Sequence, residues 1–407
     1  MKRNAAEMSA KNALCVDLDG TLIRTDLTFE SLLAALKLRP WLVLLLPWWL
    51  LLGRSHLKHQ LAQWGQMDVS VLPYRSEVID LIRSARQATR PVILVTASHE
   101  ILARHVAEHL PIFDSVLATT ADQNLSGHNK AALLEREFGV GQFEYVANGW
   151  ADLSVWRKSG AAVTVNAPSR LVRQVAAIGI PHRDIPDPGS SWQTWTRAIR
   201  LQQWLKNLLL FVPIITAHEL LNGHALVAAA LAFLSFGACA SATYIINDLL
   251  DLDADRHHHK KRLRPFAAGT IDARAGSVAL LMLLSAGLGV AWFLPIGFQL
   301  MLGTYLVTTL LYSLWLKRVA SLDVIVLAGL YTLRIVAGAL ATGINLSFWL
   351  LAFSMFIFLS LALVKRVAEA RIPTEFGDFA CYVYESTLDG EEHVALVRGN
   401  VAGDDLT

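Results

Sequence analysis

Hydrophobic positions divide the chain into two halves near residue 190. In the first half, short apolar runs alternate with amphipathic stretches. The runs lie at residues 13–16, 91–95, 144–147 and 161–165, and the stretches at 77–87, 100–110 and 130–138. This alternation is typical of a parallel sheet flanked by helices. We therefore predict an α/β domain over residues 1–180, followed at 181–195 by a linker that contains Pro, Gly and Ser.

Long apolar segments dominate the second half. They cover about residues 205–222, 225–246, 275–295, 298–316, 322–342 and 346–364. Each is close to the roughly 20 residues that a helix needs to cross a bilayer. Composition agrees, because 54% of the residues are hydrophobic and 17% are charged, against about 25% charged in soluble domains. We predict an all-α membrane bundle of six spans over residues 196–370, followed by a polar tail at 371–407.

Basic residues gather in alternate connections between the apolar segments. The connections at 217–225, 294–298 and 341–347 contain no Lys or Arg, whereas residues 256–274 contain several. Loops rich in Lys and Arg stay in the cytoplasm. We therefore expect a multi-pass protein of the cytoplasmic (inner) membrane with a cytoplasmic N-terminal domain. The net charge of +2 says little by itself. We expect the bilayer and no nucleic acid as a partner, and a homo-oligomer is left open.

One apolar run lies inside the α/β half, at residues 41–52. It is interrupted by Pro47 and flanked by Arg39 and Arg54. Its length is too short to span a bilayer. We interpret it first as an interfacial helix pair that dips into the headgroup region. A buried or partner-facing hairpin is the alternative.

The second apolar segment ends in an acidic helix face. At about 100° per residue, Asn247, Asp248, Asp251 and Asp255 fall within an arc of about 100°. Such oxygen-bearing side chains at the end of a membrane helix are costly unless they coordinate something, and hard oxygen ligands suit Mg²⁺ bound to a diphosphate. The basic residues that follow would neutralise the remaining phosphate oxygens; they include Lys261, Arg262 and Arg264. The alternative is a solvated acidic helix end.

This sequence, Asn-Asp-x-x-Asp-x-x-x-Asp followed by Lys-Arg-x-Arg-Pro, resembles the UbiA-type prenyltransferase superfamily. Two neighbouring motifs resemble its decaprenyl-phosphate phosphoribosyltransferase branch. They contribute the expected substrate-binding residues Trp204, Lys206 and Asn207 in the first span, and Lys365, Arg366 and Glu369 after the sixth. The resemblance implies that Mg²⁺ and the diphosphate belong to phosphoribosyl pyrophosphate and that a polyprenyl phosphate is the acceptor.

Two of the basic residues have a second interpretation. Lys206 lies at the cytoplasmic end of the first span, where a lysine can simply extend to the interface. Arg334 lies in the middle of the fifth span, where a charge is expensive and usually functional. We expect Arg334 to bind substrate, with an ion pair to a neighbouring helix as the structural alternative.

The first strand ends in Asp17-Leu-Asp19-Gly-Thr, which resembles the haloacid dehalogenase superfamily of phosphohydrolases. The resemblance implies that Asp17 is the nucleophile and Asp19 the general acid and base, with Thr96 and Lys130 binding phosphate. Asp17, Asp19, Asn148 and Asp152 would hold Mg²⁺. Asn148 departs from the family pattern, which has an acidic residue there. Residues 25–75 would form a helical cap that contains the run at 41–52.

The two resemblances together suggest a bifunctional enzyme. The membrane half would transfer 5-phosphoribose to a polyprenyl phosphate, and the phosphatase-like half would remove the 5-phosphate. An aromatic polyprenyltransferase that uses a polyprenyl diphosphate is one alternative. A non-catalytic, truncated variant is another, because superfamily members usually have more spans than the six predicted here. On that view, residues 371–407 resemble a loop before missing spans.

Overall fold

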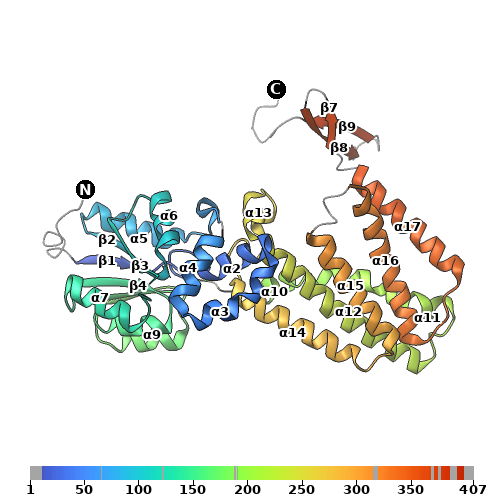
Figure 1. Ribbon diagram of the computed structural model, residues 1–407, viewed down its shortest axis with the longest axis horizontal. Coiled ribbons are helices and arrows are strands. Elements are labelled where there is room, and N and C mark those ends of the chain that lie inside the picture. Colours follow the sequence, from blue (N-terminus) through green and yellow to red (C-terminus); the bar gives the residue numbers. More distant parts are fainter. Residues whose placement is uncertain are drawn as a thin grey trace. The chain divides into compact units, whose positions relative to one another are not determined.

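The computed structural model describes residues 12–65, 67–121, 123–187, 189, 191–314, 320–367, 371–374, 377–385 and 392–397. The chain divides into two compact units. The first unit comprises residues 1–201 and 244–281, and the second comprises residues 202–243 and 282–407. Figure 1 labels the elements along the chain.

A parallel sheet forms the core of the first unit. Its six described strands are β1 (Ala13–Val16), β2 (Val92–His99), β3 (Ser115–Thr119), β4 (Phe143–Ala147), β5 (Ala161–Val165) and β6 (His182–Ile185), in the order β3-β2-β1-β4-β5-β6. Strand β1 pairs with β2 on one side and with β4 on the other, so Leu14 lies opposite both Val92 and Glu144. The strand order reverses beside β1, and ligands of such sheets bind there, at the carboxyl ends of the strands.

Helices cover both faces of this sheet (Figure 1). α5 (Ser76–Gln87) and α6 (Glu100–His109) pack on one face, and α7 (His128–Phe138), α8 (Leu153–Trp156) and α9 (Ser169–Ala176) pack on the other. Successive side chains of a strand point to opposite faces. In β1, Leu14 and Val16 join the first layer, whereas Ala13 and Cys15 join the second. Burial on both faces explains why this strand is a continuous apolar run.

A helical cap follows β1. It consists of α2 (Leu27–Leu38), η1 (Pro40–Leu44), α3 (Leu46–Leu51) and α4 (Arg54–Trp64). Asp26 caps α2 by accepting a hydrogen bond from the Phe29 amide at 2.9 Å. The run at 41–52 folds as η1 and α3, each with a proline in its first turn. Leu42 and Trp49 are buried, but Leu44 and Leu51 are about 80% exposed. Its location at a membrane surface stays a prediction.

Two further segments belong to the first unit. α10 (Trp192–Ala198) begins after Ser191, whose hydroxyl caps it. The segment from Tyr244 to Leu281 contains the end of α12 (Gly223–Leu250), then α13 (Leu252–His257), η5 (Lys261–Leu263) and the start of α14 (Ala273–Ala291).

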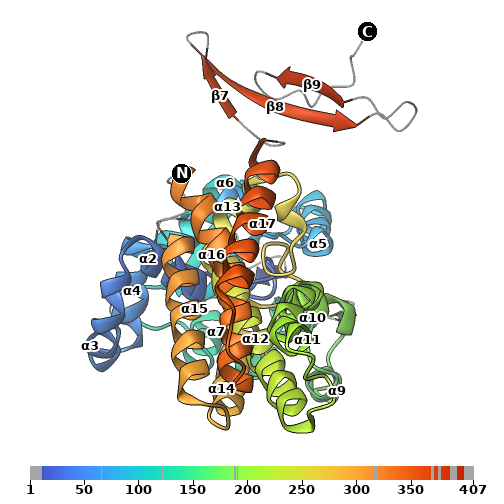
Figure 2. The ribbon, with the colours of Figure 1, turned by 90° about the vertical axis from the view of Figure 1, so that its right-hand side faces the viewer.

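The second unit is mainly helical. After η4 (Leu201–Phe211) and α11 (Val212–Thr216), its other long helices are α15 (Ile296–Leu314), α16 (Ala320–Thr342) and α17 (Phe348–Val367). α15, α16 and α17 run side by side (Figure 2). In the described part of the chain, four helical segments are long and apolar enough to cross a membrane: Gly223–Leu250, Ala273–Ala291, Ile296–Ser313 and Val324–Thr342.

Three segments differ from the sequence-based expectations. The first predicted span is a 3-10 helix followed by a short α-helix with Pro213 in its first turn, and neither is a regular spanning helix. The expected linker at 181–195 begins with β6, which pairs with β5 at the edge of the sheet. The expected polar tail contains an antiparallel sheet of β7 (Arg371–Thr374), β8 (Gly377–Glu385) and β9 (Glu392–Val397).

Trp156 tests the packing of the layer formed by α7, α8 and α9. Its side chain is fully buried, and its Nε1 donates to the carbonyl oxygen of Tyr145 at 3.1 Å. Replacing a buried tryptophan with alanine leaves a cavity, so Trp156→Ala should lower the free energy of unfolding by about 3–5 kcal/mol. Urea denaturation of the detergent-solubilised chain, followed by circular dichroism, would measure this. Trp150→Ala is the control, because Trp150 is 49% exposed; equal losses in both variants would contradict the packing described here.

Candidate functional site

The first cluster of polar side chains lies at the carboxyl end of β1. Asp17 follows this strand directly, and its amide donates to the carbonyl oxygen of Val146 at the end of β4. Lys130, in the first turn of α7, donates to Asp17 Oδ1 at 2.8 Å and to Asp152 Oδ1 at 3.3 Å. All three side chains are buried. The chain thus places one ammonium group between two carboxylates.

The second acid of the motif is held by β2 and by the cap. Asp19 Oδ2 accepts hydrogen bonds from the Ser98 hydroxyl at 2.7 Å and from the Thr96 hydroxyl at 3.1 Å. Asp19 Oδ1 accepts from the amide of Leu27 at 2.8 Å, at the start of α2. Ser98 was not among the residues expected from the sequence. Ser98 lies two positions after Thr96 on β2, so both side chains point to the same side of the strand. This spacing could have predicted Ser98 from the sequence.

The segment after β4 completes this phosphatase cluster, which we define as Asp17, Asp19, Thr96, Lys130 and Asp152. The hydroxyl of Tyr145 donates to Asp152 Oδ1 at 2.7 Å. Asn148 lies against the loop after β1, because a Cβ atom added to Gly20 would fall 2.1 Å from the Asn148 Nδ2. Gly20 also has a φ of +73°, which disfavours any side chain there. Asn148 therefore stands beside the Asp-x-Asp loop.

Burial governs the charges in this cluster. Burial, together with the charges of Asp152 and Asp19, raises the pKa of Asp17 to about 7 although Lys130 opposes the shift. Burial and the charge of Asp26 raise the pKa of Asp19 to about 6. For Lys130, burial lowers the pKa, but the carboxylates of Asp17 and Asp152 outweigh it, so its pKa lies above the usual value. These carboxylates repel each other and would gain from a further cation.

The donor set of the phosphatase cluster fits Mg²⁺. It offers the carboxylates of Asp17, Asp19 and Asp152 and the amide of Asn148, all hard oxygen donors. Within the described residues, no group of three acidic, His or Cys side chains is already arranged around a metal position. The ammonium group of Lys130 instead contacts two of the carboxylates.

The cap contacts the core strand beside the phosphatase cluster. Lys58, on α4, donates to the carbonyl oxygen of Ala97 at 2.6 Å, between Thr96 and Ser98. The adjacent His59 Nδ1 lies 3.1 Å from His99 Nε2. Burial, and then the charge of His59, lower the pKa of His99. One imidazole must therefore stay neutral for the two rings to share a hydrogen bond.

The second cluster is the acidic face, which we define as Asn247 and Asp248 at the end of α12, Asp251 between α12 and α13, and Asp255 in α13. Asp248 and Asp255 are buried. Asp248 Oδ1 accepts from Arg200 at 2.5 Å and from Arg264 at 3.1 Å. The same Nη1 of Arg264 donates to Asp255 Oδ2 at 2.7 Å, while Lys37 donates to Asp251 Oδ1 at 2.8 Å. Each of the three carboxylates of this face thus has a cationic partner.

The acidic face combines carboxylates that could bind a metal with basic side chains that contact them. Three carboxylates with hard oxygens at one helix end fit Mg²⁺, which usually bridges carboxylates to phosphate. Of the basic residues expected from the sequence, Arg264 joins the acidic face, whereas Lys261 and Arg262 are exposed on η5. Sequence reasoning missed Arg200, although it lies just before the first apolar segment. It also missed Lys37, which is 214 positions from Asp251 and carries no local signal.

Expected residues of the second unit form a separate polar group. Arg334, on α16, is buried and donates to Asn207 Oδ1 at 3.0 Å, to the Leu330 carbonyl and to the Tyr305 hydroxyl. Its guanidinium carbon also lies 5.1 Å from the Tyr305 ring centre. Asn207 is buried, and its Nδ2 has no hydrogen-bond partner among the described residues. Neutral acceptors thus contact Arg334 in the described part of the chain, and its expected role in substrate binding stays a prediction.

The other expected residues of the second unit do not form one cluster in the described part of the structure. Trp204 Nε1 donates to the Ser241 hydroxyl at 2.9 Å, and Lys206 Nζ lies 5.6 Å from the Tyr331 ring centre. Lys365 and Arg366 lie on the last turn of α17, and their side chains are outside the described part of the structure. Glu369 lies outside the described residues altogether. Substrate binding by this set stays a prediction.

Comparison with known proteins adds the family. Protein y4nM of Sinorhizobium fredii (strain NBRC 101917 / NGR234) is 39% identical over 396 residues, which cover 97% of this chain and 74% of y4nM. The chain belongs to the family of y4nM. Models of three families match parts of the chain: the haloacid dehalogenase-like hydrolases at residues 14–157, the UbiA prenyltransferase family at 209–372 and GTP cyclohydrolase II at 365–407.

Two more similarities concern the UbiA-like half of the chain. Decaprenyl-phosphate phosphoribosyltransferase of Mycobacterium tuberculosis (strain ATCC 25618 / H37Rv) is 35% identical over 188 residues, 44% of this chain and 61% of that protein. The chain therefore spans less than two thirds of that relative. A solved UbiA homolog from Archaeoglobus fulgidus bound to DMAPP and Mg²⁺ is 23% identical, covers 43% of this chain and 63% of that one, and gives a TM-score of 0.39.

These findings confirm the predicted fusion of a haloacid dehalogenase-like domain with a UbiA-type, multi-pass membrane domain. They correct the interpretation of residues 371–407 as a loop before missing spans. The described part of that segment is an antiparallel sheet, and residues 365–407 match GTP cyclohydrolase II. The segment resembled a polar tail because its apolar residues, such as Cys381 and Val383 on β8, form only short runs between polar residues.

The contact between His59 and His99 predicts a pH dependence. The pKa of His99 is lowered from 6.5 in the folded chain, so folding disfavours its protonation. Its contribution to stability is present above about pH 6.5 and is lost as the pH falls through the lower folded pKa. Asp17 and Asp19, whose pKa values are raised to about 7 and about 6, act in the opposite sense over the same range, because folding favours their protonation. The test is therefore a difference between variants: from about pH 7 to pH 5, the thermal midpoint of the unmodified chain should fall relative to that of His59→Gln.

His105→Gln is the matched control for this experiment, because His105 is an exposed residue of α6. Its pH profile should follow that of the unmodified chain. A His59→Gln profile that is also unchanged would show that the contact between the imidazoles does not contribute.

Proposed function

We propose that this chain transfers 5-phosphoribose from phosphoribosyl pyrophosphate to a polyprenyl phosphate in the membrane, and that its phosphatase domain then removes the 5-phosphate. The observation that carries the proposal is the acidic face, whose three carboxylates are each paired with a cation. Carboxylates and cations at one helix end are the groups that a metal-bound diphosphate requires. The 35% identity to the phosphoribosyltransferase favours a sugar diphosphate over a lipid diphosphate.

In the transfer step, the bond between ribose C1 and the diphosphate oxygen breaks, and a phosphate oxygen of the polyprenyl phosphate forms the new bond to C1. Asp248, Asp251 and Asp255 would hold Mg²⁺, which would neutralise charge on the departing diphosphate. Arg264 and Arg200 lie beside these carboxylates and would bind diphosphate oxygens. Arginine suits this task because its fork of donors matches phosphate geometry.

In the phosphatase step, Asp17 attacks the phosphorus of the ribose 5-phosphate, and the bond to the ribose oxygen breaks. Asp19 gives a proton to the departing ribose hydroxyl, which is consistent with its pKa being raised to about 6. Water then hydrolyses the aspartyl-phosphate on Asp17, with Asp19 taking its proton. Lys130, which donates to Asp17 at 2.8 Å, would offset the charge of the phosphoryl group. Mg²⁺ held by Asp17, Asp19, Asn148 and Asp152 would add to that neutralisation.

The cap suits a substrate that stays in the membrane. Its exposed apolar side chains gather in η1 and α3; they include Trp41, Leu44, Trp48, Leu51 and Leu52. Apolar and aromatic side chains of this kind can enter the headgroup region of a bilayer. We infer that the phosphatase domain lies on the cytoplasmic side, where the loop at 256–274 carries its Arg and Lys residues.

The transfer reaction can be tested with membranes that contain the chain. Labelled phosphoribosyl pyrophosphate and a polyprenyl phosphate should yield a labelled, Mg²⁺-dependent lipid, detected by extraction and chromatography. Asp251→Ala should lower its rate by roughly 100-fold or more, because it removes a metal ligand. Asp253→Ala should leave the rate nearly unchanged, because Asp253 is exposed and outside the acidic face. Labelling from a polyprenyl diphosphate instead would favour an aromatic prenyltransferase, and no product from either donor would favour a non-catalytic role.

The phosphatase reaction has a separate readout, the phosphate content of the lipid product. Asp17→Asn should leave the 5-phosphate on the lipid and lower its removal by roughly a thousandfold or more, because the nucleophile is absent. Mass spectrometry of the extracted lipid would distinguish the two products. Asp80→Asn, on an exposed side chain of α5, is the control. Equal phosphate content in the Asp17→Asn and unmodified products would rule out this role for Asp17.

A further inference from the structure

Helix α2 contacts both clusters within the first unit. At its start, the amide of Leu27 donates to Asp19 of the phosphatase cluster at 2.8 Å. In its last turn, Lys37 Nζ lies 2.8 Å from Asp251 Oδ1 of the acidic face. A helix rises about 1.5 Å per residue, so roughly 15 Å separate these two positions. One cap helix thus brings a cation to a carboxylate that the UbiA motif supplies.

The contact of Lys37 is part of a larger docking surface between α2 and the segment from Tyr244 to Leu281. Both carboxylate oxygens of Glu30 accept hydrogen bonds from Arg256, at 2.7 Å and 2.6 Å. Both side chains are buried, and Arg256 Nε also donates to the Ala267 carbonyl at 3.0 Å. Arg274 lies 3.2 Å from Asp26. Because this surface holds α2 in place, the position of Lys37 beside Asp251 does not depend on the Lys37 side chain alone.

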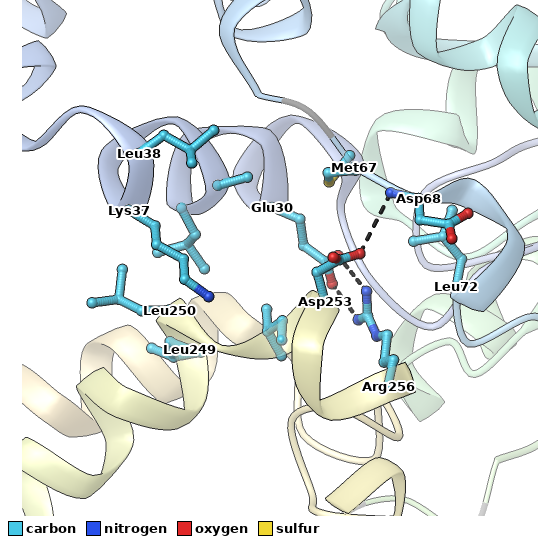
Figure 3. A pocket seen from close by; sticks show the side chains of 13 residues that line it. Glu30, Lys37, Leu38, Met67, Asp68, Leu72, Leu249, Leu250, Asp253 and Arg256 are labelled. Atoms are coloured by element: carbon cyan, nitrogen blue, oxygen red, sulfur yellow. Dashed lines mark hydrogen bonds and ion pairs between the residues drawn. The ribbon is translucent and has the colours of Figure 1, made fainter. Parts of the chain in front are cut away.

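A pocket of about 420 Å³ opens beside Lys37. Its walls include Leu33 and Lys37 of α2 and Leu249, Leu250 and Asp253 of the facing segment. Figure 3 shows Lys37 extending from α2 toward the end of α12, where Leu249 and Leu250 lie. The Lys37 side chain is 35% exposed to solvent. Its ammonium group therefore has room to move away from Asp251 without unpacking the cap.

We propose that Lys37, a residue of the phosphatase cap, binds the donor diphosphate at the acidic face of the UbiA domain. The proposal rests on the proposed function. Mg²⁺ and an ammonium group compete for the same Asp251 carboxylate, so metal binding releases Lys37 from it. A diphosphate bound to the metal carries additional negative oxygens, and the released ammonium group is already beside them. Lysine binds phosphate as a compact point charge, which needs no fixed orientation. The donor site is then built from both domains of the fusion.

The two possible roles of Lys37, a purely structural salt bridge and a group that binds the diphosphate, predict different effects of its removal. If Lys37 only held the cap, its loss would weaken the acidic face for every ligand. If Lys37 competes with the metal and then binds the diphosphate, its loss has opposite effects on the two ligands. Metal alone binds more tightly, because a competing cation is gone. Metal with pyrophosphate binds more weakly, because a phosphate partner is gone.

The test measures binding to the full chain in detergent by titration calorimetry, with Mg²⁺ alone and with inorganic pyrophosphate at saturating Mg²⁺. The heat measured with Asp251→Ala, which keeps the Mg²⁺ site proposed at the phosphatase cluster, is subtracted, so that the difference reports the acidic face. In Lys37→Met we expect tighter binding of Mg²⁺ and roughly tenfold weaker binding of pyrophosphate, as for one charge-assisted, partly exposed contact. Lys37→Arg keeps the charge and should restore pyrophosphate binding to within a few-fold. Lys158→Met should change neither affinity, since Lys158 is similarly exposed and pairs with Glu135 far from this face along the chain.

Asp68→Asn controls for cap docking. It weakens the exposed contact of Asp68 with His257, next to the docking surface, and should leave pyrophosphate binding unchanged. Circular dichroism and the thermal midpoint verify that each variant is folded. If pyrophosphate binding is unchanged in Lys37→Met, or if both affinities fall together, the proposal is overturned while the proposed function stands. If the unmodified chain and Asp251→Ala bind Mg²⁺ and pyrophosphate equally, the proposed function falls with it.

Discussion

The buried ion pair between Glu30 and Arg256 is the interaction on which the first unit depends. The side chains come from residues 226 positions apart, and the carboxylate uses both oxygens to accept from the guanidinium. Thr25 donates a further hydrogen bond to Glu30, at 2.5 Å. Burying two charges carries a large desolvation penalty, and removing one partner typically costs about 3–5 kcal/mol because the other is left uncompensated. The pair therefore specifies the register of α2 against the segment after α12 more than it adds net stability.

The same electrostatic constraint shapes both clusters. Each collects carboxylates at the end of a strand or helix, where repulsion between them must be offset. In the phosphatase cluster, Lys130 contacts Asp17 and Asp152. In the acidic face, Arg264 contacts Asp248 and Asp255. On the proposed function, a cation that balances carboxylates in the metal-free chain would become a phosphate ligand when a metal binds the carboxylates. This dual use would explain why basic side chains contact the carboxylates of both clusters.

The sequence predicted those parts of the structure that follow from local pattern and strand order. Strands β1, β4 and β5 were found because burial on both faces makes their sequences mostly apolar. Asp17, Thr96 and Asp152 come together because the carboxyl ends of parallel strands meet at one edge of a sheet. Strand β6 was read as linker because its residues, His182 to Ile185, are mostly polar and lie at the edge of the sheet.

The cationic partners could not be predicted in the same way. Arg200 and Lys37 reach the acidic face from 48 and 214 positions away, and no periodicity links them to Asp248 or Asp251. The broken first span was also missed, since hydropathy counts apolar residues but not backbone hydrogen bonds. Pro213 lacks an amide hydrogen and fixes its own φ, so an apolar run that contains it need not form one regular helix.

The docking of the cap also bears on why two such domains share one chain. On the proposed function, the product of the first reaction is a lipid that cannot leave the bilayer, so the second reaction must occur at the membrane surface. A flexible tether would supply only a high local concentration, which depends on linker length. Here α2 is fixed at one end to Asp19 and at the other to Asp251, while η1 and α3, directly after it, expose apolar side chains. The cap helix therefore has three tasks at once, which constrain different positions of its sequence: Leu27 and Ala35 for the cores, Glu30 for docking and Lys37 for the acidic face.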